Sequence, residues 1–366
     1  MSNYSENKDY ILFKVTKIFP FFSVDVGLPT LCFHVFLSII CYIIYIWTLV
    51  CLIKYKKNLL ELNETFCNTT IVGGFLDIIT HVESVAFNIF NLYPPVSELL
   101  KDLGDLSYVW TIYYSSMYFF PFCQFFLCTY IAFQRFVIIF YPFKGENVSL
   151  FNFLFFLMTL KFLKATFIPF LVLMFVTSIA PTWYLWNASI FFNQIPTIFT
   201  NGYVLRVLNY KKKDWMNNPS NSRNSIIHYS TFIGLAFFFN IISSGKILIY
   251  NYKQVKKSRE NSKQKKVNLN MLLYSICTTF TQFLFVAINF VWYFSSTTAE
   301  DPSFYYLCYV LRLYIIHLIC LTQPFYLFWL SKKVRALILR SVGVKTEISN
   351  MVGKSTTRAR VTVKKN

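Results

Sequence analysis

The chain has 366 residues, of which 55% are hydrophobic, 20% aromatic and only 14% charged, and its formal net charge is +19. A soluble globular domain carries about 25% charged residues, so this composition argues against water-soluble domains. A basic balance often indicates nucleic-acid binding, but here the lysines and arginines form short clusters between long apolar runs. Such clusters are typical of loops beside an anionic membrane leaflet. We therefore expect an integral membrane protein that contacts lipid and binds no nucleic acid.

Long apolar runs recur along the whole chain. A membrane-spanning helix needs about 20 mainly apolar residues to cross roughly 30 Å of hydrocarbon. The runs predict an all-α membrane protein, a seven-transmembrane helix bundle, with spans at about residues 31–53, 71–92, 108–140, 165–183, 226–250, 267–294 and 305–330. Residues 1–30 then form an N-terminal segment, and residues 331–366 form a basic tail.

The fourth span is the hardest to place. Residues 150–160 are apolar, but this run is too short to cross a bilayer. Lys161 and Lys164 interrupt the apolar sequence there, whereas residues 165–183 are long enough to cross alone. We therefore predict the span at 165–183, and expect the earlier run to lie along the interface or to extend the helix.

The lysines and arginines of the connections indicate an orientation, since cytoplasmic loops carry an excess of them. With the N-terminus outside, the inner segments hold 24 of these residues and the outer segments hold 9. This asymmetry predicts an outside N-terminus and a cytoplasmic C-terminus, which requires an odd number of spans. The outer segment 184–225 fits least well, because it contains Lys211, Lys212 and Lys213.

No enzymatic or metal-binding motif is present in the sequence. The nine cysteines lie mostly inside apolar runs and lack the paired spacing of a zinc site. P-loops, serine-hydrolase elbows and HExxH pairs are also absent, and the four histidines stand in four separate places. We expect a protein that is not an enzyme and that holds no metal or other cofactor.

Polar residues within the spans mark candidate interior positions, because charge in hydrocarbon is costly. In the second span, Asp77 and His81 share a helix face, and Glu83 lies on another side. Inside a bundle these residues could bind a ligand, hold an ion or pair with another helix. Arg312 and His317, in the outer half of the seventh span, could contact an entering ligand, pair with Asp77 or Glu83, or reach lipid headgroups.

Two further positions stand near the inner ends of the spans. Arg135 closes the third span, where it either contacts a partner at the cytoplasmic mouth of the bundle or extends to the lipid headgroups. In the seventh span Pro324 follows Gln323 and removes one backbone hydrogen bond. This proline predicts a kink that could act as a moving part, although many membrane helices have kinks without switching.

The tail and one sequon complete the candidates. Val334, Leu337 and Ile338 share one face of a basic stretch. They predict a short amphipathic helix on the inner membrane surface, the alternative being an unstructured tail held by charge alone. Asn187 stands in an N-x-S/T sequon on the predicted outside and is the candidate for glycosylation.

Four short motifs, in this order and spacing, resemble those of the nematode serpentine chemoreceptors, which are seven-transmembrane G-protein-coupled receptors. They are Gly27-Leu28-Pro29-Thr30, Gln134-Arg135-Phe136 with Tyr141-Pro142, Asn268-Leu269, and Thr322-Gln323-Pro324-Phe325 with Ser331-Lys332-Lys333-Val334-Arg335. The pattern is most similar to serpentine receptor class gamma and covers roughly residues 25–340.

The resemblance implies a plasma-membrane receptor, of sensory neurons and their cilia, that detects an external small molecule such as an odorant or pheromone. It also implies signalling through a heterotrimeric G protein, with Arg135 at the G-protein face. Gln134 departs from the family, which has Asn there, so the resemblance does not supply an ionic restraint on Arg135 from its neighbour. The outer loop 184–225 has no cysteine, and no disulfide to the third span is expected.

Three other classes of protein stay open from the residues alone. A seven-span ligand-gated channel of the insect chemoreceptor type has an inside N-terminus, which the charge distribution argues against. A transporter usually shows repeats and matched broken helices, and neither is evident in the sequence. A structural or trafficking protein without a ligand is opposed only by the family resemblance.

Overall fold

A computed structural model describes residues 28–55, 64–84, 107–140, 165–196, 204–211, 221–254, 262–298 and 302–341, together with Gly343. Sequence predictions for other positions lie outside the described residues. They concern the N-terminal segment up to residue 27, the end of the second predicted span at 85–92, the short apolar run at 150–160, and the tail beyond residue 343.

Helices make up almost all of the described chain. In order, the elements are α2 (Leu28–Tyr55), α3 (Glu64–Ser84), α5 (Ser107–Phe140), α7 (Phe167–Ile179), the 3-10 helix η4 (Leu185–Asn187), β1 (Ser189–Pro196), β2 (Val204–Lys211), α8 (Asn221–Gln254), α9 (Ser262–Thr298), α10 (Pro302–Leu321), α11 (Gln323–Leu330) and α12 (Lys332–Ser341).

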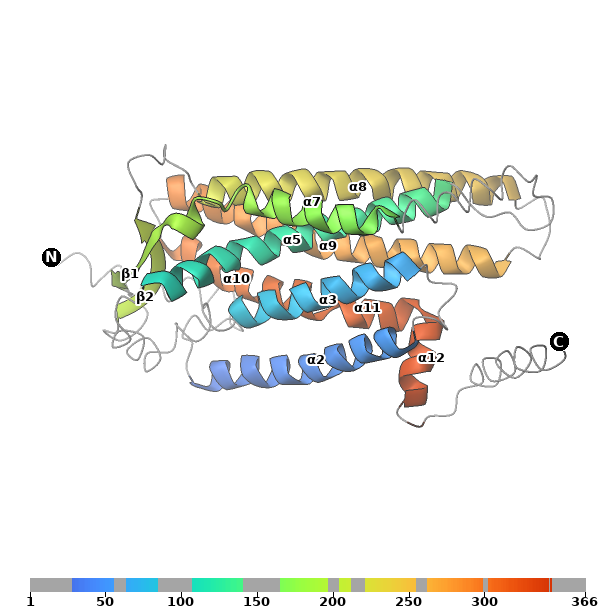
Figure 1. Ribbon diagram of the computed structural model, residues 1–366, viewed down its shortest axis with the longest axis horizontal. Helices are drawn as coiled ribbons and strands as arrows, with labels where there is room; N and C mark the ends of the chain where they lie inside the picture. Colours follow the sequence, from blue (N-terminus) through green and yellow to red (C-terminus); the bar gives the residue numbers. More distant parts are fainter. Residues whose placement is uncertain are drawn as a thin grey trace.

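The long helices lie side by side and alternate in direction, with α10 and α11 together forming the last crossing (Figure 1). The two strands lie at one end of the bundle, where α2, α5, α8 and α10 begin. The short helix α12 lies across the other end, where α2, α5, α8 and α11 finish. We refer to these as the hairpin end and the α12 end.

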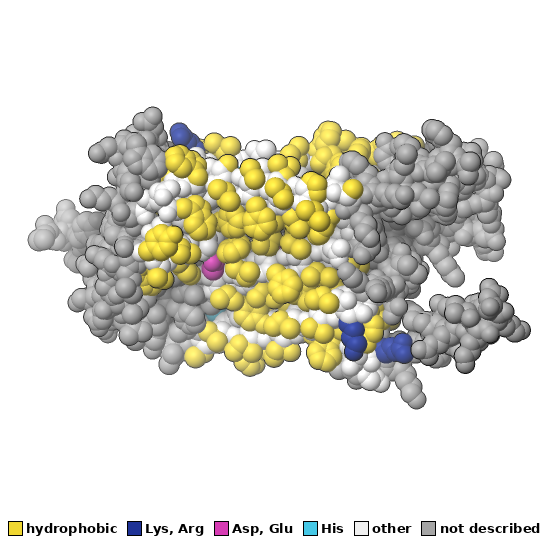
Figure 2. Space-filling view, in the orientation of Figure 1, with side chains coloured by type: hydrophobic (Ala, Val, Ile, Leu, Met, Phe, Trp, Pro, Cys, Tyr) yellow, Lys and Arg dark blue, Asp and Glu magenta, His cyan; other side chains and the backbone are white. Residues whose placement is uncertain are grey.

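The outer surface of the bundle suits lipid rather than water. Four described helices are long and apolar enough to cross a membrane, over Cys32–Tyr55, Tyr108–Phe140, Arg223–Ile247 and Leu272–Val291, and α7 is a shorter apolar helix. Hydrophobic side chains cover the middle of the face in Figure 2. Large apolar side chains such as Phe36, Ile43 and Ile241 are more than half exposed. In water this surface would be an extensive apolar patch, whereas in hydrocarbon it costs nothing.

Helix α5 is the central helix of the bundle. Within its spanning window 83% of the residues are buried, against 39% for α2 and for α8. It packs against α3, α7, α8 and α9. Phe119, Cys123 and Leu127 on α5, for example, share one apolar cluster with Leu76 of α3 and Met174 of α7. Groups carried by α5 therefore have few partners other than protein.

The connection between α7 and α8 contains a β-hairpin that the apolar runs do not predict. Strands β1 and β2 pair antiparallel there, with Ser189 opposite Lys211 and Pro196 opposite Val204. A two-stranded hairpin is marginal alone, but β1 packs against α5. The hydroxyl of Thr111 on α5 also donates a 3.0 Å hydrogen bond to the carbonyl of Ala188, just before β1. Backbone pairing and this support hold the two described strands of the connection in place.

Two helix limits also differ from the apolar runs. Helix α3 begins at Glu64, before the predicted start of the second span at residue 71, because its first turns place Phe66 and Cys67 in the buried core. The seventh crossing is interrupted at Thr322, so that Gln323 and Pro324 open a separate helix, α11. Proline fits the first turn of a helix, where its missing N–H leaves no bond unmade.

Gly74 allows α2 and α3 to approach closely. A Cβ atom there would lie 2.5 Å from Leu49 Cδ2 and 2.9 Å from Tyr45 Cε1, and both side chains are buried. We predict that Gly74→Ala forces these helices apart and lowers stability by about 1–3 kcal/mol. The thermal unfolding midpoint of the purified protein measures this effect. Gly234→Ala is the matched control, since nothing lies within 4 Å of its added Cβ; equal midpoints for the two variants would contradict the prediction.

Candidate functional site

The interior of the bundle holds a polar centre around Asp77. Its side chain is 1% exposed. The Tyr45 hydroxyl of α2 donates to Asp77 Oδ2, and the Gln124 amide of α5 donates to Oδ1 at 2.5 Å. The same amide lies 3.6 Å from the sulfur of Cys320 on α10. Asp77 therefore ties α3 to α2 and α5 by hydrogen bonds, and the Gln124 amide extends the contacts to α10.

His81 and His317 meet beside this centre. Their ring centroids lie 4.6 Å apart, and the Tyr42 hydroxyl lies 2.5 Å from His81 Nδ1. His34 of α2 joins them, with its Nδ1 3.2 Å from His317 Nε2. The sequence marked His81 and His317 but missed His34, because a lone histidine in an apolar run carries no signal of its own.

Glu83 lies apart from Asp77 and His81, as its position on the helix predicts. The Ser116 hydroxyl of α5 donates to Glu83 Oε1 at 2.6 Å. The Tyr113 hydroxyl donates to the Glu83 backbone carbonyl, also at 2.6 Å. These bonds fix the last described turn of α3 against α5.

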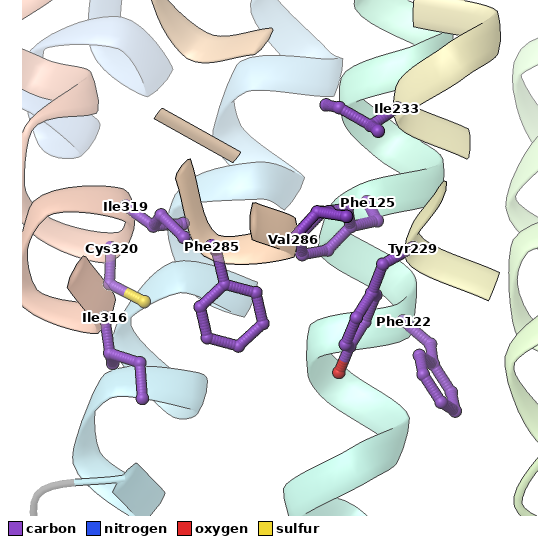
Figure 3. Close-up of a cluster of buried hydrophobic side chains, with 9 residues drawn as sticks. All are labelled: Phe122, Phe125, Tyr229, Ile233, Phe285, Val286, Ile316, Ile319 and Cys320. Carbon is purple, nitrogen blue, oxygen red and sulfur yellow. The ribbon is translucent and has the colours of Figure 1, made fainter. Parts of the chain in front are cut away.

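An aromatic cluster fills the centre of the bundle between α5, α8, α9 and α10. Its buried members, labelled in Figure 3, are Phe122, Phe125, Tyr229, Ile233, Phe285, Val286, Ile316, Ile319 and Cys320. The Arg312 guanidinium carbon lies 5.7 Å from the centre of the Phe285 ring. Because Arg312 precedes Ile316 by one helical turn, the charge borders this cluster on the side of the hairpin end. Aromatic and aliphatic groups beside a cation are the kind of lining that small-molecule sites use.

Polar aromatic residues close the hairpin end. The Tyr184 hydroxyl donates to Asn221 Oδ1, and the Asn221 amide donates to the Tyr114 hydroxyl at 3.1 Å. These contacts tie the segment before β1 to the first turn of α8 and to α5. Asn187 lies on the surface beside them. That exposure is compatible with a glycan.

At the α12 end the charged side chain of Arg135 is 5% exposed. Its guanidinium carbon lies 3.9 Å from the centre of the Phe66 ring of α3. Among the described residues, Arg135 Nε and Nη2 are buried and have no hydrogen-bond partner. The preceding Gln134 donates to the Thr69 hydroxyl at 3.0 Å. Both residues thus face α3.

At the same end, six helices meet in one apolar cluster. Its buried members are Leu52, Phe66, Cys67, Ile131, Tyr274, Leu327 and Val334, and Leu337 and Ile338 of α12 pack against it. The Tyr274 hydroxyl of α9 donates to Gln323 Oε1 at 3.0 Å. Gln323 therefore connects the start of α11 to α9. Arg135 lies on α5, which packs against α9.

A polar seam joins α8 to α9 between these regions. The Asn240 amide donates to the Thr279 hydroxyl at 2.8 Å, and the Ser275 hydroxyl donates to Asn240 Oδ1 at 2.8 Å. Such bonds between membrane helices contribute only about 0.6 kcal/mol each on average. The seam holds the two helices in register and is weak enough to be remade.

Apolar helices that enclose buried polar groups define a multi-span helical membrane protein. Residues 34–344 match the family described as "Serpentine type 7TM GPCR chemoreceptor Srv". The chain belongs to this family. No curated protein matches it in a sequence search.

The family assignment confirms the seven-transmembrane fold and the prediction of a chemosensory receptor. It names class Srv and does not confirm class gamma. A receptor of this kind generally takes a small-molecule ligand and couples to a G protein. The channel and transporter alternatives receive no support, and the family is one of receptors rather than enzymes.

The Gln124 amide is the donor that α5 supplies to Asp77. We predict that Gln124→Leu lowers the free energy of unfolding by about 1–3 kcal/mol, because the buried carboxylate loses a partner that water cannot replace. Asn289→Leu is the control. Its buried amide donates to Phe285 of its own helix, so that its loss unties no pair of helices. Thermal unfolding of both purified variants measures the two losses of stability. A larger loss for Asn289→Leu than for Gln124→Leu would contradict the role of Asp77.

Proposed function

We propose that the receptor lies in the plasma membrane of a sensory neuron, cilia included, with its hairpin end outside and its α12 end in the cytoplasm. The distribution of 24 against 9 basic residues supports this orientation. The seven spans proposed from the sequence then carry a signal from an outside ligand to a heterotrimeric G protein. Asn187 would be glycosylated at the outer end.

The proposed ligand site is the side of the aromatic cluster that faces the hairpin end. Tyr229 and Phe285 lie there with ring centroids 5.5 Å apart, and Arg312 borders them. Small-molecule sites are mostly apolar with a few polar groups that fix orientation. This composition supports a small ligand with an apolar or aromatic body, such as an odorant or pheromone, and it gives Arg312 the orienting role.

The observation that carries the coupling proposal is the state of Arg135. A buried guanidinium usually has all its donors bonded, since an unmade bond to a charged group is costly. Here Phe66 offers only its ring, so a partner that enters at the α12 end gains by accepting these hydrogen bonds. An Arg that merely reaches the headgroups would extend away from the protein, whereas this one lies over α3.

A ligand can favour the coupling-competent arrangement only by binding it better. Two helices extend from the ligand region to the α12 end and provide the route. Helix α9 contributes Phe285 to the aromatic cluster and Tyr274 to the contact with Gln323. The break at Thr322 lets α10 and α11 move separately, which gives Gln323 and Pro324 the role of a joint.

We predict that Arg135→Ala reduces receptor-catalysed nucleotide exchange on heterotrimeric G proteins to the level without receptor. The reason is that the G protein loses the charged hydrogen-bond donor that we propose it accepts from. The receptor keeps its fold, because the group that it loses is a buried guanidinium whose hydrogen bonds are not made. Purified receptor in lipid nanodiscs, tested against several heterotrimers without added ligand, supplies the measurement. The control is Arg223→Ala, an exposed arginine at the hairpin end. Full exchange by Arg135→Ala would exclude this role.

The Phe66 ring restrains Arg135 in the arrangement described. A desolvated cation–π contact contributes about 1–2 kcal/mol, which corresponds to about tenfold in an equilibrium constant. We therefore predict that Phe66→Leu raises basal nucleotide exchange by about that factor in the same assay. Phe36→Leu is the matched control, because Phe36 is 65% exposed toward lipid. Unchanged or lower basal exchange in Phe66→Leu would remove the restraint from the proposal.

A further inference from the structure

Three of the four histidines of the chain meet in one buried cluster. His34 lies near the start of α2, His81 in α3 and His317 in α10. They are 4%, 0% and 8% exposed, respectively. We refer to these three residues as the histidine cluster. Because they come from helices far apart in the sequence, the cluster is a joint between three crossings rather than a feature of one helix.

The contacts within the histidine cluster are close. His34 Nδ1 lies 3.2 Å from His317 Nε2, which is a hydrogen bond when one ring carries the proton and the other accepts it. The ring centroids of His34 and His317 lie 4.9 Å apart, and those of His81 and His317 lie 4.6 Å apart. His317 thus stands between the other two. The His34–His317 contact is most favourable when only one of the two facing nitrogens carries a proton.

Other titratable groups lie beside the histidine cluster on α2 and α10. The Tyr42 hydroxyl lies 2.5 Å from His81 Nδ1, and Cys41 and Cys320 act on Tyr42. The ring centroids of Tyr314 and His34 lie 5.2 Å apart.

The acids of α3 are engaged elsewhere. Asp77 stands one turn from His81, and both its oxygens accept hydrogen bonds from Tyr45 and Gln124. Glu83 accepts from Ser116. A first positive charge in the cluster gains some attraction from Asp77, whereas a second one meets an imidazolium at ring-contact distance.

We propose that the histidine cluster is a proton-binding site, at which acidification loosens α2 from α3 and α10. An imidazole in water takes up a proton near pH 6.5. The loosened arrangement admits water and binds more protons than the packed one, so stability falls as the pH drops below that value. The site would make the chemoreceptor sensitive to acid as well as to its ligand.

Thermal unfolding of the purified full-length receptor tests this without ligand or G protein, so that its outcome is independent of the coupling proposal. We expect the midpoint of the unaltered receptor to fall by about 5 °C between pH 7.5 and pH 5.5. His317→Gln removes the central member and should abolish most of that fall. His34→Gln should act in the same way, and it carries the test if His317→Gln does not fold.

His228→Gln is the matched control, since the fourth histidine lies on α8 against Phe122 and outside the cluster. Its midpoint should still fall more than that of either cluster variant, and only somewhat less than that of the unaltered receptor, because the half-buried His228 also takes up a proton on unfolding. Hydrogen exchange of α2 peptides at pH 5.5, compared with His317→Gln at the same pH, locates the loosening and should be faster in the unaltered receptor. The proposal would be overturned by a midpoint that does not depend on pH, or by a fall in midpoint that both cluster variants leave undiminished. It would also be overturned if His228→Gln abolished the fall, or if the hydrogen exchange of α2 peptides were equal in the two proteins.

Discussion

Hydrocarbon offers no hydrogen-bond partner, so each polar group of a membrane crossing must find one inside the bundle. The structure depends on this constraint most at Asp77, whose carboxylate is bonded by Tyr45 of α2 and Gln124 of α5. Glu83 repeats the pattern with Ser116. Because the hydrophobic effect does not draw helices together in lipid, these polar contacts and the close packing at Gly74 set the position of α2 and α3 against the central helix.

The sequence predicts the crossings far better than the contacts between them. Apolar runs identify spans because their length is set by the bilayer, and rare charges such as Asp77 and Arg135 mark interior positions for the same reason. A run does not reveal the rotation of its helix, so Tyr45 and Gln124 could not be named as partners of Asp77. His34 is a lone histidine in an apolar run and could not be marked from the sequence. Its contact with His317 follows only from the packing of the helices in the structure.

Two other features escaped the sequence for different reasons. The aromatic cluster was hidden because lipid-facing and inward-facing phenylalanines look alike in a chain with 42 of them. Phe122 is 1% exposed and Phe36 is 65% exposed, although both lie in apolar runs. The β1–β2 hairpin was hidden because its stability depends on contacts outside itself, with α5 and with the Thr111 hydroxyl.

The burial of Arg135 bears on how easily the bundle can switch. Keeping a guanidinium over the Phe66 ring, with two nitrogens unbonded among the described residues, raises the free energy of this arrangement. An arrangement that opens the α12 end to water or to a partner regains those bonds, and it sacrifices the cation–π contact and the Tyr274–Gln323 bond. In the coupling that we propose, these contributions of about 1–3 kcal/mol are opposed in sign, which would place the two arrangements close in free energy. A ligand therefore needs only a modest preference for one of them to shift the population.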